Sequence, residues 1–169
     1  MFNLYPAILD VLDSIKEDTN SIERLKVESI AFALTRFDFI FVAQFLLTIF
    51  AIKNQLNLSL QRKEQDIVNA MRLVNITKEQ LQKLRDEGWY SHLEKVTSFC
   101  NKYDIFVPKM DDIYVLPGRY RRGHVQKTND QHFRVGVFLI LIDQIMLELD
   151  DRFDEISKEL LICMSCFHP

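Results

Sequence analysis

The chain has 169 residues, of which 48% are hydrophobic, and its formal net charge is −3 at pH 7. The length suits a single domain with a proper core, and a content of only four glycines and four prolines favours long helices over a turn-rich β protein. The small negative charge excludes a global attraction to nucleic acid, so such binding must come from a local patch. Three cysteines and no signal-peptide pattern indicate reduced thiols in an intracellular protein.

Two short helices are expected at the N-terminus. The first covers Leu4 to Asp18, and the second runs from Ile22 to about Arg36 with Asn20 or Ser21 as its cap. The first helix is amphipathic, and its apolar face is formed by Leu4, Ile8, Leu12 and Ile15. Because the chain begins and ends inside predicted structure, we expect it to be a fragment or a truncated gene product.

The most apolar run of the chain is Phe37 to Ile52. A membrane-spanning helix needs roughly twenty apolar residues. This run is shorter and contains Asp38 and Gln44, with Arg36 and Lys53 at its ends. A buried core helix is therefore favoured over a membrane span, which stays the alternative.

A long helix with one polar face is predicted from about Leu60 to Glu87. Gly88 marks its end or a kink, and helical spacing then continues from Trp89 to about Asn101. The apolar seam of this helix repeats every seven residues, at Leu60, Ile67, Val74 and Leu81.

The segment Val107 to Asp130 has no helical periodicity. It contains prolines and glycines and is predicted to be a long loop, with a short strand at most at Ile113 to Leu116. Loops of about twenty residues inside a compact domain are uncommon and are usually functional or disordered.

The last predicted helix, Val135 to Met164, is the longest apolar seam in the chain. Its first half, to Leu149, is apolar on nearly every face and should be buried, whereas its second half should be half exposed. We expect this helix to be the central strut of a bundle, beside the helix Leu60 to Leu84. Its far end, Leu160 to Cys166, should present exposed apolar surface.

Concentrated positive charge occurs in one stretch only, between residues 119 and 134, where aromatic side chains are interleaved with basic ones. Guanidinium groups bind phosphates and aromatic rings stack on unpaired bases, so this mixture suits contact with a nucleic-acid backbone. The alternative is a solvated loop whose arginines pair with acids elsewhere. The candidate nucleic-acid-binding residues are Arg119, Arg121, Arg122, Lys127 and Arg134.

Metal, cofactor and catalytic chemistry find little support in the sequence. Cys163, Cys166 and His168 resemble half of a zinc site, but two cysteines at the end of an apolar helix are more often core thiols. The acid pairs Asp111–Asp112 and Asp150–Asp151 cannot converge on one ion, because adjacent residues point apart. The expectation is therefore no catalytic residue, no bound metal and no cofactor.

Ordered blocks of residues along the chain resemble the middle of hAT-superfamily transposases, specifically the branch of zinc-finger MYM-type-like and TTF-type zinc-finger proteins. The resemblance covers essentially all 169 residues. The blocks are LSLQRKEQDIVNAMRLV, TKEQLQKLRDEGW, FCNKYDIFVPKM, RYRRG, HFRVGVFLILIDQIMLELDDRF and ELLICMSC.

This resemblance implies a helical insertion domain. In the family, such an insertion interrupts an RNase H-like core that carries a DDE triad. The first two catalytic aspartates would lie before Met1, and the glutamate and a dimerisation segment would lie after Pro169. The chain departs from the family pattern at Phe133, where relatives have Tyr, and at Gly136, where they have an acid.

The sequence therefore predicts an all-α fold: one domain, residues 1–169, forming an irregular bundle of about five to six helices with two long helices and one long basic loop. The resemblance implies a nuclear, transposase-derived fragment without catalytic activity that assists DNA positioning or protein interaction. The alternative is a helical protein-interaction or dimerisation scaffold with no nucleic-acid role. Expected partners are DNA, a second copy or another protein, and not a membrane.

Overall fold

The protein is an all-α bundle, as predicted. The computed structural model describes residues 4–18, 20–61, 67–115 and 127–166, with residues 67–68 and 155–166 as backbone only. No strand forms within this described part, where the one β-bridge joins Ile113 to Thr128. The elements in chain order are α1 (Tyr5–Asp18), α2 (Ser21–Leu34), α3 (Phe37–Leu60), α4 (Ile67–Lys102), the π-helical segment η2 (Gln131–Leu139) and α5 (Ile140–Cys166).

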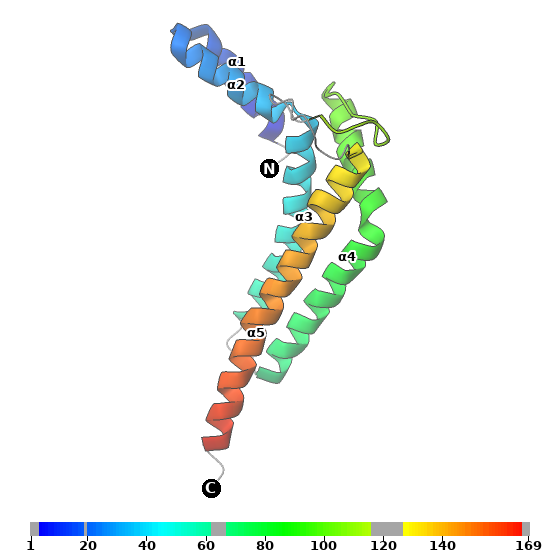
Figure 1. Ribbon diagram of the computed structural model, residues 1–169. Coiled ribbons are helices and arrows are strands. Elements are labelled where there is room, and N and C mark those ends of the chain that lie inside the picture. The colour runs from blue at the N-terminus through cyan, green and yellow to red at the C-terminus, as the bar shows by residue number, and fades with distance from the viewer. Residues whose placement is uncertain (1–3, 19, 62–66, 116–126, 167–169) are drawn as a thin grey trace.

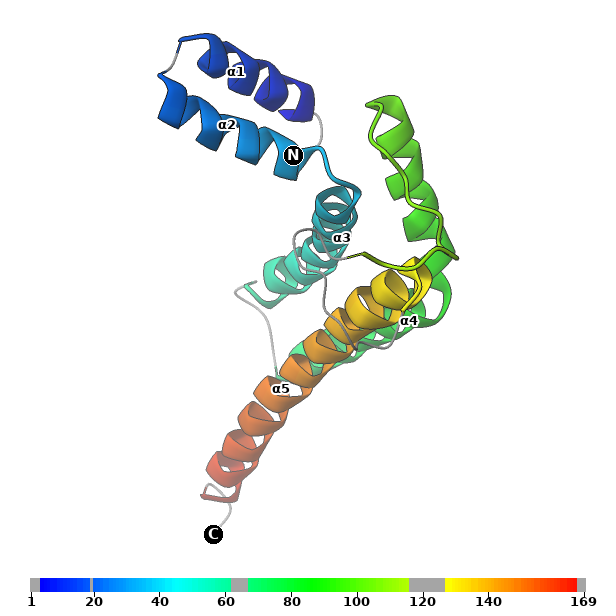
Figure 2. The ribbon, with the colours of Figure 1, turned by 45° about the horizontal axis from the view of Figure 1, so that its top comes forward.

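Three long elements form the bundle, and a helical hairpin projects from one end of it (Figures 1 and 2). The helix α3 and the continuous η2–α5 rod run in the same direction, and α4 runs antiparallel to both (Figure 1). The α1–α2 hairpin extends away from the bundle at the end where α3 begins. At the opposite end α5 continues beyond its neighbours.

An aromatic cluster at the meeting point of the three elements forms the core. The rings of Phe41 and Phe45 from α3 face those of Trp89 from α4 and Phe138 from η2, with centroids 5.0 to 5.9 Å apart in the Phe41–Trp89, Phe45–Phe138 and Trp89–Phe138 pairs. Phe133 adds a second ring from η2, 5.0 Å from Phe41. Aromatic pairs at these separations stabilise a core by roughly 0.5–1.5 kcal/mol each beyond their burial.

His92 lies inside this aromatic cluster, which the sequence analysis did not anticipate. Its ring is 4.7 Å from the ring of Phe41 and is stacked 5.7 Å from that of Phe138. The Nε2 atom is buried and has no hydrogen-bond partner within the described part. Burial, together with nearby Lys95, lowers the pKa of His92 from 6.5 to about 4 despite a hydrogen bond to the Phe41 backbone. The imidazole is therefore neutral at physiological pH.

The apolar helix α3 is longer than predicted and is buried on one side only. It continues past Ile52 to Leu60, which closes α3 rather than opening the next helix. Phe39, Leu46 and Phe50 are exposed on its other side. By length and composition α3 is the one described helix that could cross a membrane, a test that the mostly buried core helix of a soluble protein also passes.

The helix α4 is one continuous element from Ile67 to Lys102 that bends along its length (Figures 1 and 2). Two members of the predicted seam, Val74 and Leu81, are fully buried, whereas Leu60 belongs to α3 and the side chain of Ile67 lies outside the described part. Gly88 does not end the helix. A Cβ at this position would lie 2.6 Å from Leu84 Cδ1, so the Leu84 side chain would have to shift, whereas its 3.4 Å separation from Phe138 Cζ would be an ordinary contact.

The prediction for the last helix was wrong in two respects. Residues 129–130 are already helical, and π-helical turns follow from Gln131, in which hydrogen bonds from i to i+5 place residues five apart on one face. Phe133 and Phe138 are accordingly both buried, and the predicted seam residue Val135 is exposed. The first half is also not buried on every side, since Ile140 and Leu147 are exposed. The α-helical part follows the predicted seam through Ile142 and Leu149.

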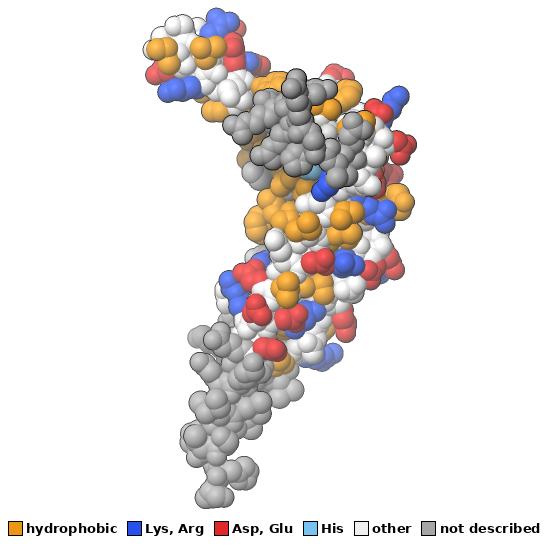
Figure 3. Space-filling view, in the orientation of Figure 1, with side chains coloured by type: hydrophobic (Ala, Val, Ile, Leu, Met, Phe, Trp, Pro, Cys, Tyr) orange, Lys and Arg blue, Asp and Glu red, His pale blue; other side chains and the backbone are white. Residues whose placement is uncertain are grey.

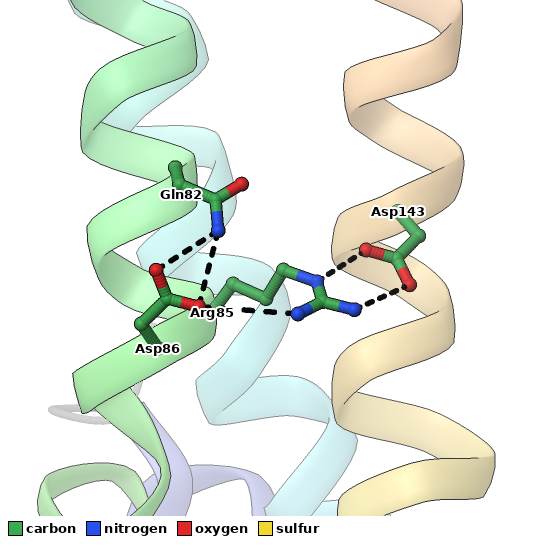
Figure 4. A network of polar contacts seen from close by, with 4 residues as sticks. All are labelled: Gln82, Arg85, Asp86 and Asp143. Carbon is green, nitrogen blue, oxygen red and sulfur yellow. Dashed lines mark hydrogen bonds and ion pairs between the residues drawn. The ribbon is translucent and has the colours of Figure 1, made fainter.

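Ion pairs join α4 and α3 to α5 along the outside of the bundle. Arg85 forks onto Asp143, with Nε 2.6 Å from Oδ1 and Nη2 3.3 Å from Oδ2, and this contact raises the pKa of the guanidinium (Figure 4). Asp86 beside it accepts two hydrogen bonds from Gln82. Lys78 pairs with Asp150, and Lys53 lies 3.3 Å from Glu148. The α4 neighbour predicted for α5 is therefore confirmed, and its contact is partly electrostatic.

The α1–α2 hairpin is attached to the bundle through its open end. Asn20 caps α2 as predicted, by accepting a hydrogen bond from the Glu23 amide at 3.2 Å. Tyr5 is buried against Phe99 and Tyr103 near the end of α4, with ring centroids 5.2 and 5.1 Å away. Its hydroxyl also donates to the Leu34 carbonyl at 3.1 Å, which ties the start of α1 to the end of α2.

Candidate nucleic-acid interface

The basic segment starts and ends at one place, beside the N-terminus of η2. The Ile113–Thr128 bridge and a 2.8 Å hydrogen bond from the Tyr114 amide to the Lys127 carbonyl hold its two ends together. The residues between these ends, 116–126, lie outside the described part, and so do Arg119, Arg121 and Arg122. The structure therefore places two of the five predicted nucleic-acid-binding residues, Lys127 and Arg134.

Asn129 is the anchor of this loop, although the sequence marked it only as a loop residue. Its side chain is buried, and its Nδ2 donates to the Lys109 carbonyl at 2.8 Å. The backbone N–H of Asn129 donates to the Asp112 carbonyl, also at 2.8 Å. Because a buried amide group must satisfy several donors and acceptors, Asn129 fixes the incoming and outgoing segments of the loop relative to each other.

A reciprocal pair of hydrogen bonds starts η2. The Gln131 amide donates to Thr128 Oγ1 at 3.2 Å, and the Thr128 amide donates to Gln131 Oε1 at 3.3 Å. This is a capping box, whose sequence signature is Thr or Ser followed three residues later by Gln or Glu. Thr128 and Gln131 match this signature, although the predicted helix start did not take it into account. The signature would have placed the first residue of the last helix at Asn129, six residues before the start at Val135 that the apolar spacing predicted, and residues 129–130 are indeed helical.

A flat aromatic pair lies beside this helix start. The rings of Tyr114 and His132 stack with centroids 3.6 Å apart and an interplanar angle of 11°. Burial lowers the pKa of His132 and raises that of Tyr114, so both rings are uncharged at neutral pH. His132 is one of the aromatic residues interleaved with the basic ones, and because its ring is already stacked on Tyr114, its stacking on a base has no support in this arrangement.

The charges of the two described basic residues are not neutralised by ion pairs. Lys127 is exposed and Arg134 is half-buried, and neither forms an ion pair with an acid of the described part. Acidic residues do occupy the same loop, namely Asp111, Asp112 and Asp130. Attraction for a phosphate backbone therefore depends chiefly on the three arginines between residues 119 and 122.

The described residues form no candidate metal site and contain no activated thiol. No group of three or more His, Cys, Asp or Glu side chains that could hold a metal ion occurs among them. Cys100 is buried in the core, and burial raises the pKa of its thiol to about 11, which makes it a poor ligand and nucleophile. The side chains of Cys163 and Cys166 lie outside the described part.

No protein-family model, no curated protein and no solved structure matches this chain. The resemblance to hAT transposases therefore stays a prediction.

Proposed function

We propose that this chain is a helical interaction module that catalyses no reaction of its own and works by docking onto other protein surfaces. The observation that carries the proposal is the amount of apolar side chain left outside after the bundle has formed its core. Exposed large hydrophobic residues occur on α1, α2, α3 and η2–α5. Hydrophobic side chains gather over the middle of the bundle in Figure 3.

The outer face of α3 carries exposed apolar side chains. Phe39, Leu46 and Phe50 follow one another at helical spacing, and their residues are 36%, 36% and 58% exposed. Contiguous apolar patches of more than a few hundred Å² are rare on monomers and usually mark interaction sites. Such a face is expected of a domain that in its parent protein is covered by further structure.

This function fits the role implied by the family resemblance. A helical insertion in a nuclear, transposase-derived protein has to pack beside a separate catalytic core, so some of its helices must be apolar on their outer side. The proposal supplies a reason for the exposed faces and assigns no reacting residue to the chain.

Association measured at several salt concentrations tests the proposal. We expect the folded chain to bind a hydrophobic dye such as ANS while its near-UV circular dichroism stays native, and its self-association to be insensitive to salt, because apolar contacts are not screened. A native chain that binds no dye and stays monomeric would contradict the interaction role.

DNA contact through the basic segment is the second candidate function. The observation that favours it is the tethering of this segment at both ends beside Lys127, whose charge is free of ion pairs within the described part. The segment is thus presented at one site of the molecule. Its phosphate contacts would be salt-sensitive and largely independent of sequence.

Gel shifts at several salt concentrations separate the two candidates. Replacing Arg121 and Arg122 together by Ala should weaken DNA binding and reduce the salt slope by about one for each lost phosphate contact. The Lys83→Ala, Lys95→Ala variant is the control, because it removes the same charge from exposed positions of α4. No binding by the parent chain at low salt, or equal loss in both variants, would remove the DNA role.

A further inference from the structure

The α1–α2 hairpin is a helix pair with almost no core of its own. Each helix has 14 residues, and a helix of this length is marginal in water unless it is packed. Among the described side chains of the hairpin, only Tyr5 is buried, and it contacts α4 at the open end. The rest projects away from the bundle (Figures 1 and 2).

The helix α1 carries two neighbouring apolar stripes. The first is the less exposed one, with Tyr5, Leu9 and Leu12 at spacings of four and three. The second is displaced from it by one residue, which is about 100° around a helix. The second stripe consists of Leu4, Ile8, Val11 and Ile15, at spacings of four, three and four residues. These residues are 41–63% exposed.

Two apolar faces about 100° apart are what a helix at the corner of a four-helix bundle needs. Each helix in such a bundle packs against two neighbours, which lie roughly at right angles around it. Within the described part α1 has α2 as such a neighbour, and the face for the other neighbour is exposed.

The helix α2 supplies a complementary exposed stripe. Ile22, Leu25 and Phe32 lie within about 80° of one another around the helix, at seven-residue and three-residue spacings. Their residues are 70%, 67% and 67% exposed. Both helices of the hairpin therefore present an apolar stripe to solvent.

The charges of the two helices favour contact between α1 of one chain and α2 of another. The range of α1 contains four acids and one lysine, a net charge of −3, and that of α2 contains two acids and two basic residues, a net charge of 0. Two copies of α1 against each other would therefore bring together two helices of charge −3. Contact between α1 of one chain and α2 of another avoids this repulsion.

The exposed area is that of a dimer interface. The seven stripe residues of α1 and α2 together expose roughly 700 Å², close to the ~800 Å² that each partner contributes to a stable protein–protein interface of standard size. A twofold axis would use the same surface on both chains, because each hairpin offers one stripe of each kind.

We propose that the occupant of this surface is a second copy of the chain, and that two α1–α2 hairpins form a four-helix bundle in which α1 of each copy packs on α2 of the other. This inference rests on the proposed interaction function and names the partner of one of its surfaces.

Complementary variants test this pairing by sedimentation between about 1 and 100 µM. The parent chain should dimerise, and Val11→Glu and Leu25→Lys should each weaken its dimer roughly tenfold or more, because each buries a charge opposite an apolar stripe. Mixing the two variants should restore dimers, since the carboxylate introduced on α1 of one chain then meets the ammonium introduced on α2 of the other. Leu147→Glu on α5 is the matched control, because Leu147 is 61% exposed and lies outside the hairpin.

Each other outcome overturns the pairing. A parent chain that is monomeric throughout, but binds the hydrophobic dye in its native state, excludes the dimer and leaves the interaction function standing. A dimer that Leu147→Glu disrupts and Leu25→Lys does not places the contact on the bundle. Single variants that remain monomeric when mixed exclude contact between α1 and α2 of different chains.

Discussion

The bundle and the hairpin are both built from helices that carry apolar residues, but among the described side chains the core lies almost wholly in the bundle. In the bundle Phe41, Phe45 and Phe138 are fully buried, whereas Phe32 on the hairpin is 67% exposed. The exposed stripe of α1 repeats in steps of four and three residues, as a buried helical seam would. Helical periodicity therefore shows which face of a helix is apolar, and the number of neighbouring elements decides whether that face is covered.

The largest difference should appear when one Phe is removed from each region. Phe138→Ala deletes a ring that contacts Phe45, Trp89 and His92, and it should lower the free energy of unfolding by about 3–5 kcal/mol. Phe32→Ala is the matched variant on the hairpin, and it should change the free energy of unfolding by less than about 1 kcal/mol at concentrations where the chain is monomeric. Urea titration followed by circular dichroism measures both. Equal losses would mean that the hairpin side chain is as well packed as the core.

The second largest effect should be a loss of stability in acid that originates in the bundle. The pKa of His92 is about 4 in the folded chain and near 6.5 when unfolded, so between these values the unfolded state binds a proton that the folded state does not. Stability from this group is complete above about pH 6.5 and falls by about 3 kcal/mol as the pH drops to 4.

His92→Phe isolates this contribution, because the other titrating groups remain. The difference in unfolding free energy between the parent chain and the variant should change with pH over this window and be constant above it. A pH-independent difference would show that His92 keeps a normal pKa.

A smaller effect should separate the hairpin from the bundle. Tyr5→Phe removes the hydrogen bond to the Leu34 carbonyl and keeps the ring, so it should cost about 1 kcal/mol. Amide hydrogen exchange should accelerate in α1 and α2 and be unchanged in α4. Acceleration spread evenly over all helices would mean that the hairpin and the bundle unfold as one unit.

The smallest expected effect is an increase in the free energy of unfolding when Gly136 in the bundle is replaced. A Cβ at Gly136 would have no atom nearer than 3.8 Å, and glycine costs roughly 0.5–1 kcal/mol relative to alanine inside a helix. Gly136→Ala should therefore raise the unfolding free energy by about that amount in thermal or urea melts. A loss of stability would show that the π-helical turns depend on this glycine.

Part of the candidate interface could be predicted from the sequence and part could not. The interleaved basic and aromatic residues were visible, but whether Tyr114 and His132 stack on each other depends on a contact between residues 18 positions apart. Asn129 likewise became an anchor only through carbonyls contributed by residues 109 and 112. The Thr128–Gln131 capping box, in contrast, is local and was legible in advance.

The sequence by itself determined the all-α class, the helices and the seam of α4, because periodicity and capping depend on residues a few positions apart. Tertiary structure decided which apolar faces are covered. Val135 and Phe133 differ in burial because π-helical turns rotate the face that meets α3 and α4, and His92 is neutral because three helices close around it. The stripes of α1 and α2 are exposed for the same reason, since burial requires a neighbouring element and the described part of the chain places none there.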